Sequence, residues 1–359
     1  LESIEGQSND HSEAIIQSTS SPFRNAQEQS NVPVSIQIVQ SQYDRHIQNH
    51  QWEEAIQSAL LLYAHGNEED QQNILEQVKT DLTTGGLLQN ALGVAEHISD
   101  RQIETSPYYV SNLIDLAVLH TRLGNSDQSI ELYNQALELA RQHDNQNKQA
   151  RIIGNLGLLH QANGDLDLAL QQYLSALDIF QMLDNIDKTG SIHGNIGTIF
   201  HEQGNIESAI PHFDTAIDLA QKCNNLINYG ACLGNRAMCL VELDQLPQAT
   251  TDFEKAIGIC DQHLEFAAGA FRAELAHLYM KQGKLEQIDD LLIRGETQVR
   301  EYKEQYGKFL CRKASIYYGL HQYSTVQESL RLAEQISIEL KTKATSALQS
   351  TLTKTQQEI

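Results

Sequence analysis

The feature that most constrains the fold of this chain is a segment that recurs every 40 residues. The run Gly154-Asn155-Leu156-Gly157 is followed by Gly164, and the pattern returns at Gly194-Asn195-Ile196-Gly197 with Gly204. A third copy begins at Gly234-Asn235. A fixed period of this length is typical of repeat arrays, in which each unit buries its apolar face on its neighbour. A chain of 359 residues can then fold without a single large core.

The spacing inside each copy is that of paired helices. Counted from the turn residue, a small residue lies five positions on, an aromatic ring nine positions on and alanine twelve positions on, all on one helical face. A small residue seven positions before the turn supplies the other half of this contact. The turn residues are Gly124, Gly164, Gly204 and Asp244, followed less regularly by Gly283 and His321. The pattern predicts an all-α array of about eight helix pairs.

The array is expected to span residues 33–342, with regular repeats at about 107–265 and diverged repeats at both ends. Residues 1–32 are rich in Ser, Gln, Asn and Glu, which predicts a disordered or loosely docked segment. An alternative is that this segment folds back into the groove of its own array as an autoinhibitor. Residues 343–359 are predicted to form a C-terminal cap or tail. Because the chain begins at Leu1, we expect a fragment or a processed product of a larger protein.

The charge balance restricts the partners. Lys plus Arg number 25 and Asp plus Glu number 47, for a net charge of −22, which disfavours binding to nucleic acid and to anionic membranes. An acidic surface keeps a protein dispersed, and the alternative interpretation is that it attracts a basic partner. The five cysteines form no C-x-x-C pair, which fits reduced thiols in a cytoplasmic protein.

Sequence motifs for catalysis are missing. The chain has no H-E-x-x-H, G-x-S-x-G or Walker-type Gly-Lys-Ser/Thr motif, so we expect no enzymatic activity, no cofactor and no metal site. The sequence also has no run of 18 apolar residues.

The repeat resembles the tetratricopeptide repeat (TPR) across roughly 300 residues. The matching positions are a small residue in the first helix, Gly-Asp at the turn and three residues of the second helix: Gly157, Gly164-Asp165, Ala169, Tyr173 and Ala176. This resemblance implies a right-handed α-solenoid superhelix whose first helices line a concave groove. The 40-residue period is similar to that of Pins-type spindle-orientation adaptors and kinesin light chains.

One polar position recurs where the resemblance places the groove. Nine residues before each turn lie Asp115, Asn155, Asn195 and Asn235, followed by Glu274 and Arg312 in the diverged units. In the adaptors that the chain resembles, an Asn at this place holds the backbone of an extended peptide. A carboxamide is suited to that role because it offers a donor and an acceptor at once.

Three glycines precede these asparagines. We expect Gly154, Gly194 and Gly234 to leave room for a bound main chain, and the alternative is that Asn and Gly pack against the next repeat. One turn earlier, Arg151 is the expected anchor for a partner carboxylate. The equivalent flanking positions in the other repeats are Ser111, Ser191 and Ala231, and about one turn after the asparagine position lie Thr121, Gln161 and His201.

These features favour a protein interaction module, an adaptor or scaffold that binds an extended protein or peptide segment. The alternative is a sensory or regulatory TPR domain of a larger signalling protein that responds to a peptide or small ligand. A third alternative is a scaffold for a homo-oligomer, because the sequence does not define the oligomeric state.

Overall fold

The computed structural model describes residues 36–65, 68–84, 87–101, 109–340 and 347–359. The predicted N-terminal segment 1–32 lies outside the described residues, as do residues 343–346 of the predicted cap or tail. Within the described ranges the regular structure is helical and contains no strand. The chain divides into two compact units, residues 1–148 and 149–359, and each is considered by itself.

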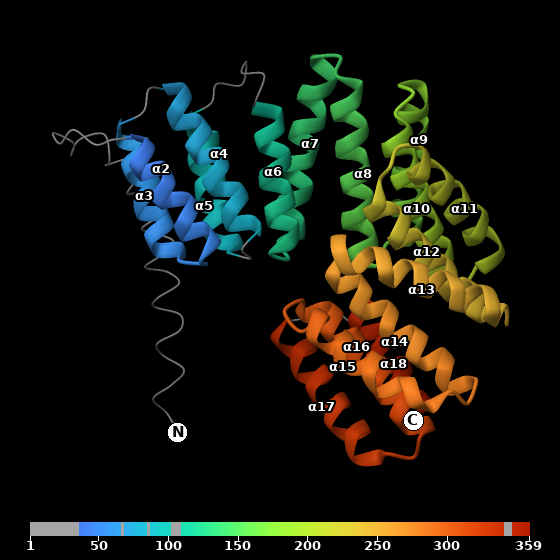
Figure 1. Cartoon of the computed structure of the whole chain (residues 1–359). Coiled ribbons are helices and arrows are strands. Elements are labelled where there is room, and N and C mark those ends of the chain that lie inside the picture. Colours follow the sequence, from blue (N-terminus) through green and yellow to red (C-terminus); the bar gives the residue numbers. More distant parts are fainter. Residues whose placement is uncertain (1–35, 66–67, 85–86, 102–108, 341–346) are drawn as a thin grey trace. The chain divides into compact units, whose positions relative to one another are not determined.

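The helices follow one another as pairs, and we call the first member of each pair the A helix and the second the B helix (Figure 1). In unit 1 the helices are α2 (Ile36–Gln48), α3 (Trp52–His65), α4 (Glu68–Thr84), α5 (Leu88–Arg101), α6 (Tyr109–Arg122) and α7 (Ser126–Gln142). The next helix, α8 (Gln146–Asn163), begins in unit 1 and continues into unit 2.

The other helices of unit 2 are α9 (Leu166–Met182), α10 (Ile186–Glu202), α11 (Ile206–Lys222), α12 (Leu226–Glu242), α13 (Leu246–His263), α14 (Glu265–Lys281), α15 (Ile288–Val299), α16 (Lys303–Gly319), α17 (Tyr323–Glu339) and α18 (Ala347–Glu358). A short 3₁₀ helix, η2 (Leu285–Gln287), precedes α15. The described residues therefore contain eight A–B pairs followed by α18, which confirms the all-α repeat array.

The turns between A and B helices lie where the sequence predicts them. Gly164 and Gly204 adopt φ values of 85° and 74°, the left-handed conformation that favours glycine. After α10, the Gly204 N–H donates to the His201 carbonyl and the Asn205 N–H to the Phe200 carbonyl, which is the Schellman arrangement. The other predicted turn residues also have positive φ, namely Gly124, Asp244, Gly283 and His321. All six turn positions are thereby confirmed.

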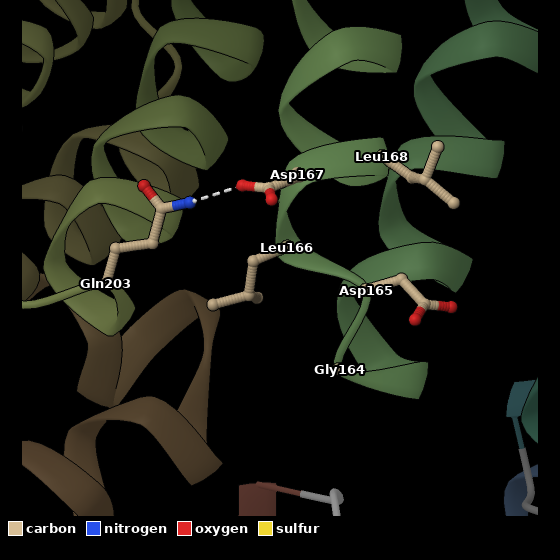
Figure 2. A pocket seen from close by; sticks show the side chains of 6 residues that line it. All are labelled: Gly164, Asp165, Leu166, Asp167, Leu168 and Gln203. Carbon is tan, nitrogen blue, oxygen red and sulfur yellow. Dashed lines mark hydrogen bonds between the residues drawn. The ribbon is translucent and has the colours of Figure 1, made fainter.

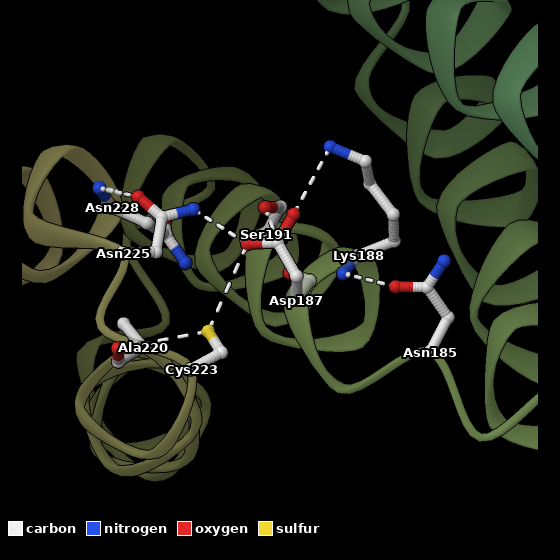
Figure 3. Close-up of polar contacts among 8 residues, drawn as sticks. All are labelled: Asn185, Asp187, Lys188, Ser191, Ala220, Cys223, Asn225 and Asn228. Carbon is white, nitrogen blue, oxygen red and sulfur yellow. Dashed lines mark hydrogen bonds and ion pairs between the residues drawn. The ribbon is translucent and has the colours of Figure 1, made fainter.

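Polar side chains fix the connections from B helices to the next A helices. Asn185 and Asn225 cap α10 and α12, since each side-chain oxygen accepts a hydrogen bond from the backbone N–H three residues later. The Asn225 amide also donates to Asp187 at 2.6 Å, and the Lys188 ammonium lies 3.2 Å from the same carboxylate (Figure 3). These contacts hold the pKa of Asp187 below its usual value, chiefly through the Asn225 bond. Successive repeats of unit 2 are thus joined at their edges as well as through their core.

The core of unit 2 depends on contacts between small residues and aromatic rings. A Cβ atom added at Gly157 would lie 2.7 Å from the ring of Tyr173, and one added at Gly197 would lie 2.9 Å from the ring of Phe213. Both rings are fully buried. The predicted packing of the small A-helix position against the B-helix ring is confirmed, and it fixes how closely the two helices approach.

The last helix, α18, packs on the final pair. Leu348 and Leu352 of α18 are buried against Leu310 and Cys311 of α16. Its other described side chains are mainly exposed and polar, so this helix presents a solvated face beyond the last repeat. Among the described helices, none is long and apolar enough to cross a membrane.

The close approach at Gly197 predicts opposite effects for two glycine substitutions. Gly197→Ala should lower stability by about 1 kcal/mol, because overpacking against Phe213 outweighs the gain in helix propensity. Gly258→Ala is the matched control, since Gly258 is exposed in α13 and an added Cβ there meets no atom within 4 Å. It should raise stability by roughly 1 kcal/mol. Chemical denaturation measures both, and equal stabilisation by the two variants would contradict the proposed ring contact.

Candidate functional site

A groove of about 710 Å³ lies within unit 2. Its walls come mainly from successive A helices, which place residues of similar register side by side. The lining residues are Gln161, Gly164, Leu166, Thr198, His201, Glu202, Ala231, Asn235, Met238, Leu264, Phe266, Ala267, Ala270, Phe271, Glu274, Gln305, Lys308, Ser350 and Thr351. The C-terminal helix α18 therefore contributes to this groove through Ser350 and Thr351.

Helical spacing explains which residues face the groove. Ala231, Asn235 and Met238 are four and seven residues apart on α12, so they share one face of that helix. Two of these positions, Ala231 and Asn235, were predicted from the sequence, and so were Gln161 and His201. The sequence pattern also placed Glu274 of α14 at the position equivalent to Asn235, but it missed the other contributions of α14 and those of α16 and α18.

The groove has an apolar floor around the start of α14. Phe271 is 6% exposed and covers Gly234 of α12. Phe266 contacts Tyr302 in a tilted arrangement, with 5.0 Å between ring centroids. Met238 and Leu264 complete this floor. It offers a partly exposed apolar surface for one or two side chains of a bound segment.

A chain of hydrogen bonds orients one carboxylate in the groove. The buried Tyr173 hydroxyl donates to Oε1 of Gln161 at 3.0 Å, and Nε2 of Gln161 donates to Oε1 of Glu202 at 3.0 Å. Because the hydroxyl occupies the amide oxygen of Gln161, the amide nitrogen is directed at Glu202. The Glu202 side chain is accessible to solvent in the groove, yet the surrounding protein displaces much of its water and raises its pKa.

The other charges of the groove are already paired. Lys308 binds Glu304 at 2.7 Å, His201 binds Glu242 at 2.8 Å, and Arg312 binds Glu274 at 2.8 Å. Burial, assisted by Arg312 and Lys281, lowers the pKa of the nearby His277 to about 3. The neutral His277 ring can therefore accept a hydrogen bond from Arg312.

The predicted asparagines occupy different environments. Asn235 lines the groove, and its amide lies 3.5 Å from the Thr198 hydroxyl of the preceding A helix. Asn155 and Asn195 are half-buried on α8 and α10 and are outside the set that lines the cavity. The structure thus brings one of the three asparagines into this groove.

The glycines beside these asparagines lie against the next repeat. A Cβ atom added at Gly154, Gly194 or Gly234 would point at the next A helix, with nearest distances of 3.3 Å to Ile192, 2.9 Å to Cys232 and 2.1 Å to Phe271. The missing side chains make room for the following repeat, which is the alternative that the sequence left open. Packing between repeats therefore accounts for all three glycines.

The remaining predicted residues are dispersed. Asp115 belongs to unit 1, where its carboxylate pairs with Lys79 of α4 at 2.9 Å. In unit 2, Arg151 is exposed on α8, and the Ser191 hydroxyl donates to the Asp187 carbonyl of its own helix. None of these three residues lines the groove.

A second hollow of about 450 Å³ lies at the α8–α9 turn (Figure 2). Gln203 donates to Asp167 at 3.2 Å across it, which links this turn to the end of α10. Among the described residues, no three His, Cys, Asp or Glu side chains are grouped closely enough to hold a metal ion.

Comparisons with known proteins agree with the repeat pattern. A tetratricopeptide-repeat sequence profile matches residues 88–182 and 188–262. No curated protein sequence matches the chain.

Three solved structures have a similar fold. A Rap protein complexed with competence and sporulation factor is 15% identical, with a TM-score of 0.60 over 90% of this chain and 98% of that chain. The apo quorum sensor NprR from B. thuringiensis is 14% identical, with a TM-score of 0.57 over 91% and 99%. The apo form of RapI is 14% identical, with a TM-score of 0.57 over 76% and 100%. At these identities the likeness concerns the fold.

The environment of Glu202 predicts a pH-dependent gain in stability for Glu202→Gln. Its raised pKa in the folded state means that the protonated side chain stabilises the fold at low pH, and that this contribution is lost as pH rises through the raised pKa. The variant should therefore have a higher Tm than the wild type at pH 7. The difference should vanish below the ordinary glutamate pKa, about 4.3.

Thermal unfolding across this pH range measures the effect. Glu207→Gln is the control, because Glu207 is exposed on α11 and does not line the groove. A Tm difference for Glu202→Gln that is unchanged at low pH would contradict the interpretation.

Proposed function

The chain is a TPR-type repeat protein, and from this premise we propose that the groove of unit 2 binds an extended peptide segment. The protein then acts as a non-enzymatic interaction module. The observation that carries the proposal is the groove of about 710 Å³, because it combines an apolar floor with polar walls from successive A helices. Peptide sites commonly combine pockets for side chains with groups that bind the main chain.

Asn235 is the proposed main-chain contact. Its bond to Thr198 is long at 3.5 Å, so exchanging it for a shorter bond to a peptide group has little cost. A carboxamide can pair with both the N–H and the C=O of a bound strand whatever its sequence. A segment that extends beyond the cavity along α10 and α8 would reach the equivalent Asn195 and Asn155.

The apolar floor is the proposed side-chain anchor. Phe266 and Leu264 are half-buried beside Met238, so a bound aliphatic or aromatic side chain would remove further apolar surface from water. Burial of this kind contributes roughly 25 cal/mol for each Å² removed from water. The anchor would supply affinity, while Asn235 would fix the position of the main chain.

A second candidate is a peptide-responsive regulatory domain. The similar folds of a Rap protein complexed with competence and sporulation factor and of the quorum sensor NprR support it. In this role, peptide binding would change the pitch of the array, because each repeat interface can contribute a small rotation. Small-angle X-ray scattering would show a changed radius of gyration on peptide binding, and an unchanged profile would favour the adaptor.

Filling the groove should prevent binding. Ala231→Trp places an indole one turn from Asn235, where it would occupy the space of a bound segment. Peptides selected from a random display library on the wild-type protein should bind this variant at least about tenfold more weakly, which corresponds to ~1.4 kcal/mol. Fluorescence anisotropy measures the affinities.

The matched control is Gln171→Trp, an indole at an exposed position of α9 outside the groove. It should bind the selected peptides like the wild type. Failure to select any peptide, or equal binding by Ala231→Trp, would contradict the proposed function.

The asparagine contacts have a separate test. Replacing Asn155, Asn195 and Asn235 together with Ala should weaken binding of the same peptides by about 1 kcal/mol for each hydrogen bond lost, while Tm changes little. Asn235→Ala alone shows whether the peptide contacts only Asn235 or all three asparagines. An effect equal to that of the triple variant restricts the contact to the groove, and a smaller effect extends it along α10 and α8. A triple variant that binds like the wild type would rule out asparagine contacts.

A further inference from the structure

Glu202 differs from the other charged residues in and beside the groove because its carboxylate has no ion-pair partner among the described residues. The groove cation Lys308 has Glu304 as its carboxylate partner, and Arg312, which neighbours the groove, has Glu274. Among the described residues, no Lys, Arg or His nitrogen lies within ion-pair distance of the Glu202 carboxylate. Its direct partner is the neutral amide of Gln161.

This carboxylate is also held in place. Tyr173 is fully buried, and its hydroxyl fixes the Gln161 amide that donates to Glu202. An ionised carboxylate can accept about four hydrogen bonds, so one amide donor leaves most of its capacity for a ligand. A positioned acceptor loses less conformational freedom on binding than a mobile one.

The surroundings make an added cation favourable. Partial loss of water around Glu202 disfavours its negative charge in the absence of a ligand, and an opposite charge at close range would reverse this effect. Such perturbed carboxylates are concentrated at functional sites. The net charge of −22 adds a long-range field that attracts cationic segments.

We propose that Glu202 binds a cationic group of the peptide, either a Lys or Arg side chain or the free amino terminus. This inference rests on the proposed function of the groove and adds the chemistry of its partner. Gln161 acts as a positioning residue for the carboxylate. The peptide that fits the groove therefore has a positive charge near the apolar residue that occupies the floor around Phe266.

Lys308 is the internal competitor for Glu202. It lies across the groove on α16, close enough to favour the charged form of Glu202, but its ammonium group binds Glu304. A direct Glu202–Lys308 pair would close the groove without a ligand. Lys308→Met tests whether Lys308 competes with the peptide for Glu202. If it competes, the variant should bind cationic peptides more strongly than the wild type. If Lys308 stays bound to Glu304, the affinity should be unchanged. Weaker binding would contradict the assignment of Glu202 as the cation acceptor.

The first experiment compares peptides selected from one random display library on three proteins. The wild type and Glu207→Gln should both enrich peptides that carry Lys or Arg at one position, whereas Glu202→Gln should not. Equal Lys and Arg enrichment on Glu202→Gln would overturn the proposal. If no peptide is selected on the wild type, the proposed function itself fails. Selected peptides that are sensitive to Ala231→Trp but show no cationic preference contradict only this inference.

The second experiment measures the coupling between one selected peptide and Glu202. Replacing the enriched Lys or Arg with Gln should weaken binding to the wild type by at least about tenfold and have little effect on Glu202→Gln. N-terminal acetylation should produce this pattern instead if the amino terminus is the cation. If each peptide change weakens binding equally for the wild type and for Glu202→Gln, Glu202 contacts neither the side-chain cation nor the amino terminus.

The third experiment tests the positioning role of Gln161. Gln161→Leu should reduce the coupling between Glu202 and the peptide cation, while peptides that carry Gln in place of the cation should bind as they do to the wild type. A uniform loss for both kinds of peptide would indicate a general structural effect and would contradict the positioning role. Glu202→Lys provides the reverse test, because it should favour a peptide with Glu at the cationic position.

Discussion

In the regular repeats of unit 2, the arrangement of the helices depends on the contact between a small residue of the A helix and an aromatic ring of its B helix. Gly157 receives Tyr173, and Gly197 receives Phe213 in the same geometry 40 residues later. Because this contact sets the distance between paired helices, it also fixes where the next A helix can lie. The groove is a consequence, since A helices in constant register present residues of one helical face to a common surface.

The constant register also produces contacts between repeats at a spacing of 41 residues. Gln161 binds Glu202, and His201 binds Glu242, through positions that are equivalent in the two repeats. The chemistry differs because the first acid meets a neutral amide and the second meets an imidazole. A repeated backbone position thus yields Glu202, which has no ion-pair partner among the described residues, and Glu242, which can pair with His201.

The sequence predicted those features that depend on one helix or one turn. Positive φ at the turn residues follows from the Schellman geometry, and the packing of Gly197 on Phe213 follows from their spacing. For Gly234 the sequence left two alternatives open, because its packing depends on the ring of Phe271 in the next A helix. The environment of Glu202 was missed for a similar reason, since Gln161 and Lys308 approach it only after several repeats have stacked.

The loss of strict periodicity after α13 gives the groove its specific character. Three residues join α11 to α12, whereas Leu264 alone joins α13 to α14, and the repeat shortens from 40 to 39 residues. The shorter connection places Leu264 and Phe266 in the groove, next to residues of the regular repeats. A perfectly periodic array would offer equivalent sites along its whole length. Here the irregular repeat supplies the apolar floor and a regular one supplies Glu202, so their combination occurs at a single place in the groove and defines both the position and the chemistry of a bound segment.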